Sequence, residues 1–326
     1  MQLRGFLSHR LSTVIVVGLA AGLLGGCSLN KLAVNLVAKT LSSGGDSTVF
    51  TAEDDPQLVA DSLPFAMKLY ESLLEQTPEN TELLLTTGSV FAMYANAFVQ
   101  TPAGMLPDTE YEQQARMLER AKKLYLRARG YLFRAMDLRH PGFTEAMDHN
   151  REDEVLAAMS EEDVPYLFWT GASWLGAFST NPYDMEFLLN IAKPLAIMNR
   201  ALELDESFGD GMIHDTFISV YGSLPPSLGG GEERARYHFR RAVELSEGKT
   251  SSPYVALATT ISVPRQDVEE FRRLLEKALA IDPDSSPQNR LVNIITQNKA
   301  RWLLEHIDDY FLLDEGWEEE QEIDQP

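Results

Sequence analysis

Lys277-Ala278-Leu279-Ala280-Ile281-Asp282-Pro283 is the clearest copy of a short pattern that recurs along this chain. Similar stretches begin at Arg200, Arg241 and Arg134, and a fainter one begins at Ser72. Four of the five copies carry an alanine in the second position. A residue this small lets a neighbouring helix approach closely, so the pattern predicts helices that pack in pairs.

Helix pairs that repeat about every 34 residues, with a small residue on the second helix, are typical of tetratricopeptide proteins. The alanines at positions 201, 242 and 278 are 41 and 36 residues apart, so these repeats are divergent and carry longer loops or extra helices. Stacked pairs bury a continuous core and leave a concave surface for a ligand or partner. We therefore expect an all-α fold, a tetratricopeptide-like superhelical solenoid of divergent helix pairs.

Hydrophobic spacing along the chain agrees with helices. From Pro56 onward, apolar residues recur with helical spacing, and the alternation typical of strands is hard to find. Between Val268 and Ala278, for example, apolar residues occupy one face and charged residues occupy the other. Proline and glycine mark the breaks, as at His140-Pro141-Gly142.

Cys27 is the single cysteine of the chain, and it follows a typical secretory signal. Two arginines precede an apolar run over residues 14–24, and Leu24-Gly25-Gly26-Cys27 is similar to a bacterial lipobox. We expect cleavage before Cys27 and acylation of its thiol by a chain such as palmitate. An uncleaved anchor is the alternative, but the apolar run is shorter than the about 20 residues that span a bilayer. Ser28, in place of aspartate, favours the outer membrane, facing the periplasm.

These features predict four parts. They are a signal peptide at 1–26, a lipid-anchored segment and linker at 27–55, a tetratricopeptide-like helical domain at 56–312, and an acidic tail at 313–326. With Cys27 lipidated, no thiol remains for a disulfide, a metal site or a nucleophile.

The charge of the chain excludes one class of partner. After loss of the signal, 26 basic and 49 acidic residues remain, a formal charge of −23. So acidic a chain repels nucleic acids and anionic lipid surfaces, so we expect no nucleic-acid partner and contact with the membrane only through the lipid anchor.

Catalytic and metal-binding patterns are missing from the sequence. The histidines at 140, 149, 214, 238 and 306 do not have metal-ligand spacing, and no nucleophile elbow occurs. We expect no enzyme activity, no metal and no cofactor. His214 lies on an apolar helix, where a lone histidine is either a hydrogen-bonded core residue or a ligand contact.

Two aromatic-rich stretches, residues 91–98 and 166–174, mix large rings with small residues. This composition fits close helix packing in a solenoid, or an apolar, aromatic-lined cavity that holds a ligand. The sequence leaves both interpretations open.

Several motifs, in order along the chain, resemble the TRAP transporter T-component (TatT) family of tetratricopeptide-like periplasmic lipoproteins. They span roughly residues 49–311 and lie at 63–66, 94–99, 140–143, 165–174, 201–211, 228–231, 242–246, 278–283, 290–293 and 299–304. The resemblance implies an all-helical homotrimer with a ligand-accessible pore in each subunit. It also implies a TRAP-type periplasmic solute-binding protein as partner, and a small organic acid or hydrophobic molecule as ligand.

From their positions in the aromatic motifs, Trp169, Trp174, His214 and Tyr221 are the residues expected to contact that ligand. A scaffold lipoprotein that assists outer-membrane protein or pilus assembly is the alternative function. It would bind peptides in an open groove and carry no small molecule.

Overall fold

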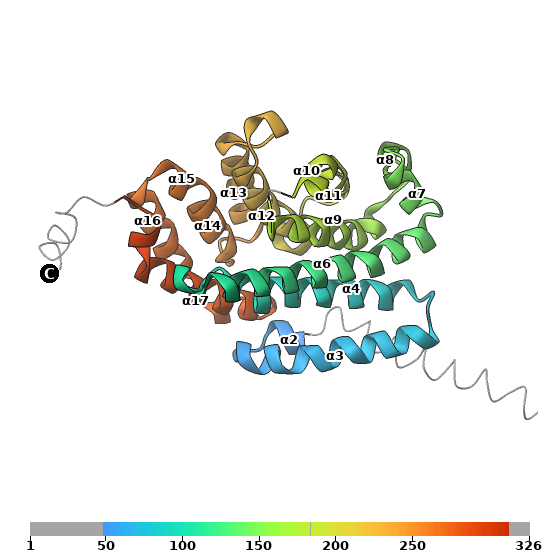
Figure 1. Cartoon of the computed structure of the whole chain (residues 1–326), viewed down its shortest axis with the longest axis horizontal. Helices are drawn as coiled ribbons and strands as arrows, with labels where there is room; N and C mark the ends of the chain where they lie inside the picture. The colour runs from blue at the N-terminus through green and yellow to red at the C-terminus, as the bar shows by residue number, and fades with distance from the viewer. Residues whose placement is uncertain (1–47, 183, 313–326) are drawn as a thin grey trace, which may run out of the picture.

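The computed structural model describes residues 48–182 and 184–312, which form helices joined by turns, with no strand among them (Figure 1). The all-α prediction is confirmed. The predicted signal peptide, Cys27 and the acidic tail lie outside the described residues, and so does most of the predicted linker.

Long helices make up most of the described chain. They are α3 Pro56–Gln76, α4 Thr81–Ala95, α6 Tyr111–Arg139, α9 Val164–Ser179, α11 Ala192–Leu204, α12 Phe208–Ser223, α13 Glu232–Leu245, α16 Val268–Leu279 and α17 Arg290–Glu305. Shorter helices lie between them: α2 Thr48–Thr51, α5 Thr101–Ala103, α7 Phe143–Asp148, α8 Glu152–Leu156, α10 Met185–Asn190, α14 Ser252–Leu257 and α15 Val263–Arg265. Single π-helical turns at Asn96–Gln100 and Ala258–Ser262 extend α4 and α14.

Neighbouring helices pack in pairs through the small residues of the repeated pattern. Helix α12 packs on α13, and α16 packs on α17. The pattern alanines Ala135, Ala201, Ala242 and Ala278 are at most 1% exposed. Their burial agrees with the sequence argument that a small residue at this position allows close approach.

Helix α12 lies between two hydrophobic cores. Ile213, Phe217 and Tyr221 belong to a larger core formed with α3, α4, α6, α9 and α11. Ile218 faces a second core built from α13, α14, α16 and α17. Being buried on both sides, α12 holds the two groups of helices together.

A left-handed turn starts α12 and directs it toward α13. Gly209, Asp210 and Gly211 have φ angles of 56°, 57° and 88°. A Cβ atom on Gly211 would lie 3.0 Å from the Cβ of Leu245 at the end of α13. Glycine is therefore favoured here for two reasons: it adopts the positive φ without strain, and its lack of a side chain lets the two helices approach closely.

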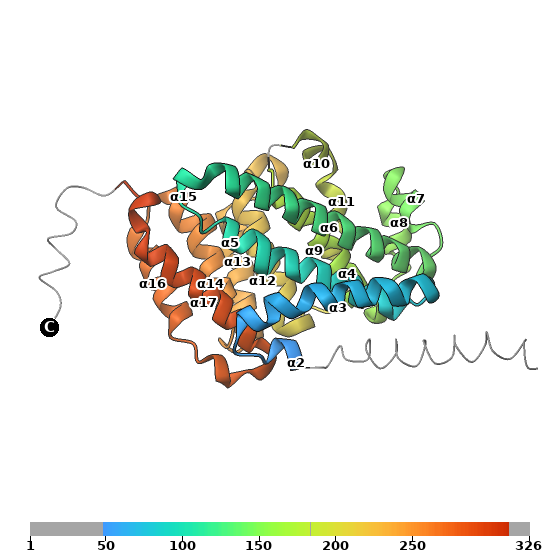
Figure 2. The same ribbon diagram turned by 60° about the horizontal axis from the view of Figure 1, so that its bottom comes forward.

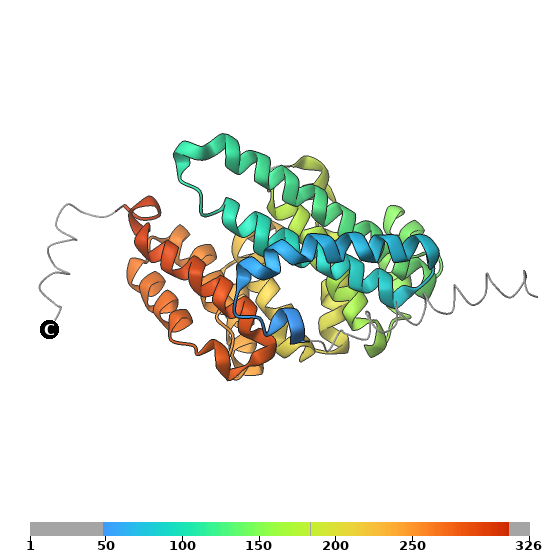
Figure 3. The same ribbon diagram turned by 90° about the horizontal axis from the view of Figure 1, so that it is seen from below.

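The beginning of the described chain contacts its end. Helix α2 and the start of α3 pack against α17, and Figure 3 shows these segments side by side from below. Arg290 at the start of α17 donates to the carbonyl of Ala52 at 3.1 Å. In an open solenoid each repeat contacts only its neighbours, so this contact closes the helical array on itself.

One helical stretch of the described chain, Thr81–Ala103, is long and apolar enough to cross a bilayer. Its most apolar window is 56% buried inside the protein, against other helices. This burial is what the core helix of a folded domain shows, and α4 packs extensively on α6.

Gly176 on α9 and Gly130 on α6 offer a matched test of close helix packing. A Cβ on Gly176 would lie 2.5 Å from the buried Tyr125 ring, whereas a Cβ on Gly130 meets nothing within 4 Å. We expect Gly176→Ala to lower the free energy of unfolding by about 1–3 kcal/mol, because the rigid ring must move. Gly130→Ala should raise it by about 0.5–1 kcal/mol. Urea denaturation measures both, and equal effects would contradict the close contact.

Candidate ligand-binding site

Two buried histidines meet where α12 packs on α13. The Nδ1 atoms of His214 and His238 lie 2.7 Å apart. His214 is fully buried and His238 is 5% exposed. The ring of Phe217 lies 4.9 Å from that of His238, and the ring of Tyr221 stacks on His238 with 5.3 Å between centroids. The pair is thus enclosed by aromatic rings.

The hydrogen bonds around the pair fix which nitrogens carry protons. His214 Nε2 lies 3.1 Å from Glu206 Oε1, and Arg241 donates to the same oxygen at 2.8 Å. Because a carboxylate only accepts, His214 must donate from Nε2, and its Nδ1 is then free to accept. His238 donates from Nδ1 to that nitrogen.

Both rings are held neutral. Burial lowers the pKa of His214, although Glu206 opposes the shift. Burial, His214 and Arg234 together lower the pKa of His238 to about 3. A neutral, hydrogen-bonded pair of this kind is a core feature of the α12–α13 contact.

Two of the four expected ligand contacts, His214 and Tyr221, therefore lie in one cluster. Tyr221 is 2% exposed, and the guanidinium of Arg234 covers its ring at 4.1 Å. Exposed Arg234 is itself tied to the carbonyl of Gly229 at 2.6 Å. The cluster is closed on the side of α13 by this arginine.

The two tryptophans lie elsewhere, on α9. Trp174 is buried, packs edge-on against Phe133 at 5.6 Å and lies under Arg129 at 4.8 Å. Trp169 is half-buried and contacts Phe168 at 5.0 Å. Trp174 thus lies between α6 and α9, and His214 and Tyr221 lie between α12 and α13, whereas the ring contact of Trp169 is with its neighbour on α9.

Sequence reasoning missed two half-buried charged residues, Asp215 and Lys299. Asp215 on α12 accepts from Ser252 at 2.6 Å, and the surrounding protein raises its pKa to about 6. Lys299 on α17 has no hydrogen bond or ion pair with any described residue, and the surrounding protein lowers its pKa. No sequence signal marks either residue, because the groups that surround them are brought together only by the packing of the helices.

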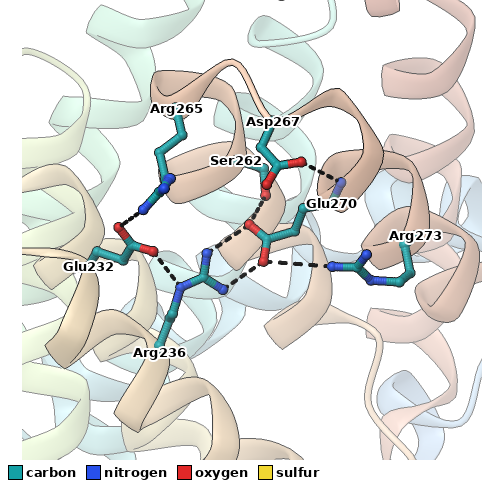
Figure 4. A network of polar contacts seen from close by, with 7 residues as sticks. All are labelled: Glu232, Arg236, Ser262, Arg265, Asp267, Glu270 and Arg273. Carbon is teal, nitrogen blue, oxygen red and sulfur yellow. Dashed lines mark hydrogen bonds and ion pairs between the residues drawn. The ribbon is translucent and has the colours of Figure 1, made fainter.

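A polar network ties α13 to α15 and α16 but leaves no free group for a ligand (Figure 4). Arg236 donates to both oxygens of Glu270, at 2.7 and 2.8 Å, and to Glu232 at 2.7 Å. Ser262 donates to Glu270 at 2.9 Å, and Arg265 donates to Glu232 at 2.5 Å. Each carboxylate here is already satisfied, so the network braces the second core.

Among the residues that the structure describes, no group of three or more metal-ligating side chains comes together.

Comparison with known proteins places the chain among transport components. A family model described as TRAP transporter T-component matches residues 52–311, nearly the whole described part. An uncharacterized protein of Treponema pallidum (strain Nichols) is 36% identical over 305 residues, covering 89% of this chain and 94% of that protein.

The histidine pair makes stability depend on pH. Because the folded-state pKa of His238 lies below its usual value, the unfolded chain binds the extra proton, and stability present above pH 6.5 is lost as pH falls toward 3. We expect His238 to lower the free energy of unfolding by about 1.4 kcal/mol per pH unit below about pH 6.5. Urea denaturation from pH 7 to 5 measures this slope before most carboxylates titrate.

His238→Gln should remove the part of the slope that His238 contributes. His149→Gln is the matched control, because His149 is exposed and contacts neither ring. The same slope in the wild type and both variants would show that the pair is not held neutral.

Proposed function

This chain belongs to the TRAP transporter T-component family, and from this premise we propose that it is a lipid-anchored accessory protein of TRAP-type solute uptake. The observation that carries the proposal is the match of the family model over residues 52–311. The family is a transport component of the cell envelope and not an enzyme family.

Within this proposal the helix pairs form a tetratricopeptide-like array that binds a small ligand and docks a partner protein. The lipid on Cys27 holds the chain at the outer membrane, facing the periplasm. The chain assembles as a homotrimer and docks a TRAP-type solute-binding protein. The buried pattern alanines support the repeat interpretation, since they sit where such repeats pack.

We propose a small apolar organic acid as the ligand, with Lys299 as the partner of its carboxylate. Lys299 keeps part of its surface open while the surrounding protein disfavours its charge, and no described carboxylate pairs with it. An anion supplied by a ligand would satisfy this amine. The contacts expected from the sequence, Trp169, Trp174, His214 and Tyr221, stay a prediction apart from Lys299, since they lie in separate groups on α9 and α12.

Retained organic acids test the role of Lys299. Residues 28–326 would be purified from periplasm, and small molecules extracted from the protein would be identified by mass spectrometry. We expect Lys299→Met to lower the retained carboxylic acids about tenfold, because the loss of one charge-assisted contact costs about 1.5–3 kcal/mol. Lys277→Met is the control, since Lys277 is exposed on α16. Equal retention by both variants would overturn the assignment of Lys299.

Capture of the partner tests the transport role directly. Residues 28–326 would be immobilised and exposed to the periplasmic extract of the host, and retained proteins would be identified by mass spectrometry. Recovery of a TRAP-type solute-binding protein is the expected result. Recovery of outer-membrane or pilus assembly proteins in its place would favour the scaffold function that the sequence left open.

A further inference from the structure

Helix α6 is positively charged, whereas the chain as a whole is negatively charged. The whole chain has a formal charge of −21, yet the 29 residues of α6 carry eight basic and three acidic side chains. The basic residues are Arg116, Arg120, Lys122, Lys123, Arg127, Arg129, Arg134 and Arg139. Positive charge is therefore concentrated on one element of an otherwise acidic protein.

Five of these residues form an exposed line, the basic stripe. Arg116, Arg120, Lys123, Arg127 and Arg134 are all exposed. Their spacing of four, three, four and seven residues keeps them on one face of the helix. Figure 2 shows α6 running along the outside of the molecule.

The stripe is only partly neutralised by its neighbours. Arg116 and Lys123 face Glu112 and Glu119 at 3.6 and 3.3 Å, in exposed pairs one helical turn apart. Such pairs are worth little and are readily exchanged for better partners. Arg120 contacts the ring and hydroxyl of Tyr94 but makes no ion pair within the described chain.

Two shallow recesses lie along the same stripe. One of about 530 Å³ is lined by Ala115, Arg116, Glu119, Arg120 and Lys123. The other, of about 480 Å³, lies where α6 faces α3 and includes Arg127 and Arg134. In the second recess Glu71 is held by Lys68, Tyr131 and Arg127, so it is saturated. Arg134 donates to the carbonyl of Pro78 and lies 6.0 Å from the centre of the Tyr131 ring, with no carboxylate partner in the described chain.

An acidic segment of matching chemistry follows the last described residue. Residues 313–326 contain seven acidic residues, no basic residue and one tryptophan, Trp317. The chain just before this segment is anchored at α15. Leu312 donates to Gln266 at 2.9 Å, and Gln266 donates to the carbonyl of Tyr310 at 2.9 Å.

This anchor lies beside the start of α6. Burial raises the pKa of Tyr310, and so do the charges of Asp309 and Asp108, so Asp108 is close to Tyr310. Asp108 comes three residues before α6 begins. Figures 2 and 3 both show the end of the described chain near the first turn of α6.

Fourteen residues reach far enough to follow the stripe. An extended chain spans about 3.3 Å per residue, or about 45 Å for the segment. The stripe from Arg116 to Arg134 is about 27 Å long at about 1.5 Å per helical residue. The short tether also gives the segment a high effective concentration at the stripe.

From this charge complementarity, anchor point and reach, we infer that residues 313–326 dock along the basic stripe of α6. The carboxylates pair with Arg116, Arg120 and Lys123 nearest the anchor. This inference does not depend on the transport role.

Carbodiimide cross-linking of the mature chain tests the docking. The reagent joins a carboxylate to a lysine amine without a spacer, and Lys123 is the lysine of the stripe. We expect peptides that link residues 313–326 to Lys123, and none that link them to exposed Lys277. Arg116→Gln with Arg120→Gln should lower the yield about tenfold, because charge-assisted contacts are lost. Arg151→Gln with Arg240→Gln, also exposed, is the charge-matched control.

Three outcomes would overturn the inference: no link to Lys123, equal links to Lys123 and Lys277, or equal yields from both double variants. A mixture of isotope-labelled and unlabelled chains identifies the source of the segment. Links that join a labelled peptide to an unlabelled one would show that a second copy supplies it, which overturns docking within one chain.

Discussion

Helix α12 is buried on two sides, so the polar groups on its buried faces must find partners inside the protein. His214 meets this requirement with His238 and Glu206, and Asp215 meets it with Ser252. These bonds determine how α13 and α14 sit on α12. The left-handed turn at Gly209–Gly211 brings α12 to α13, and the rest of the second core is built outward from this contact. The position of the helices after α12 therefore depends on the hydrogen bonds made by the buried polar groups of α12.

Sequence reasoning predicted the helical fold because the information was local. The periodicity and the pattern alanines are properties of single helices, and Ala135, Ala201, Ala242 and Ala278 are buried as small contact residues should be. The histidine pair was out of reach, because its members are 24 residues apart and meet only through the packing of α13 on α12. Lys299 was missed for a similar reason. Its lack of a partner depends on which carboxylates the fold brings near it, and no spacing rule reports that.

Charge has different roles inside and outside this protein. A chain this acidic repels anions in solution, so an organic acid needs a shielded place where a cation meets it. Lys299, whose charge is disfavoured by the surrounding protein, is the cation that we propose for this contact. The exposed arginines of α6 lie in water, where each contact is weak and only several together hold a partner. Affinity for an anion at Lys299 would depend on that one residue, whereas affinity along α6 would depend on the number of charges that take part.

Helix α2, near the start of the described chain, contacts α17 near its end, and Arg290 of α17 donates to the carbonyl of Ala52. This contact has a consequence for evolution. Open repeat proteins lengthen by duplicating a unit, because a new unit needs only one neighbour. A closed array has no vacant end to receive another unit, and an added pair would force the first and last helices apart. Evolution can therefore change the length of the loops, but a change in the number of helix pairs would break the contact between α2 and α17.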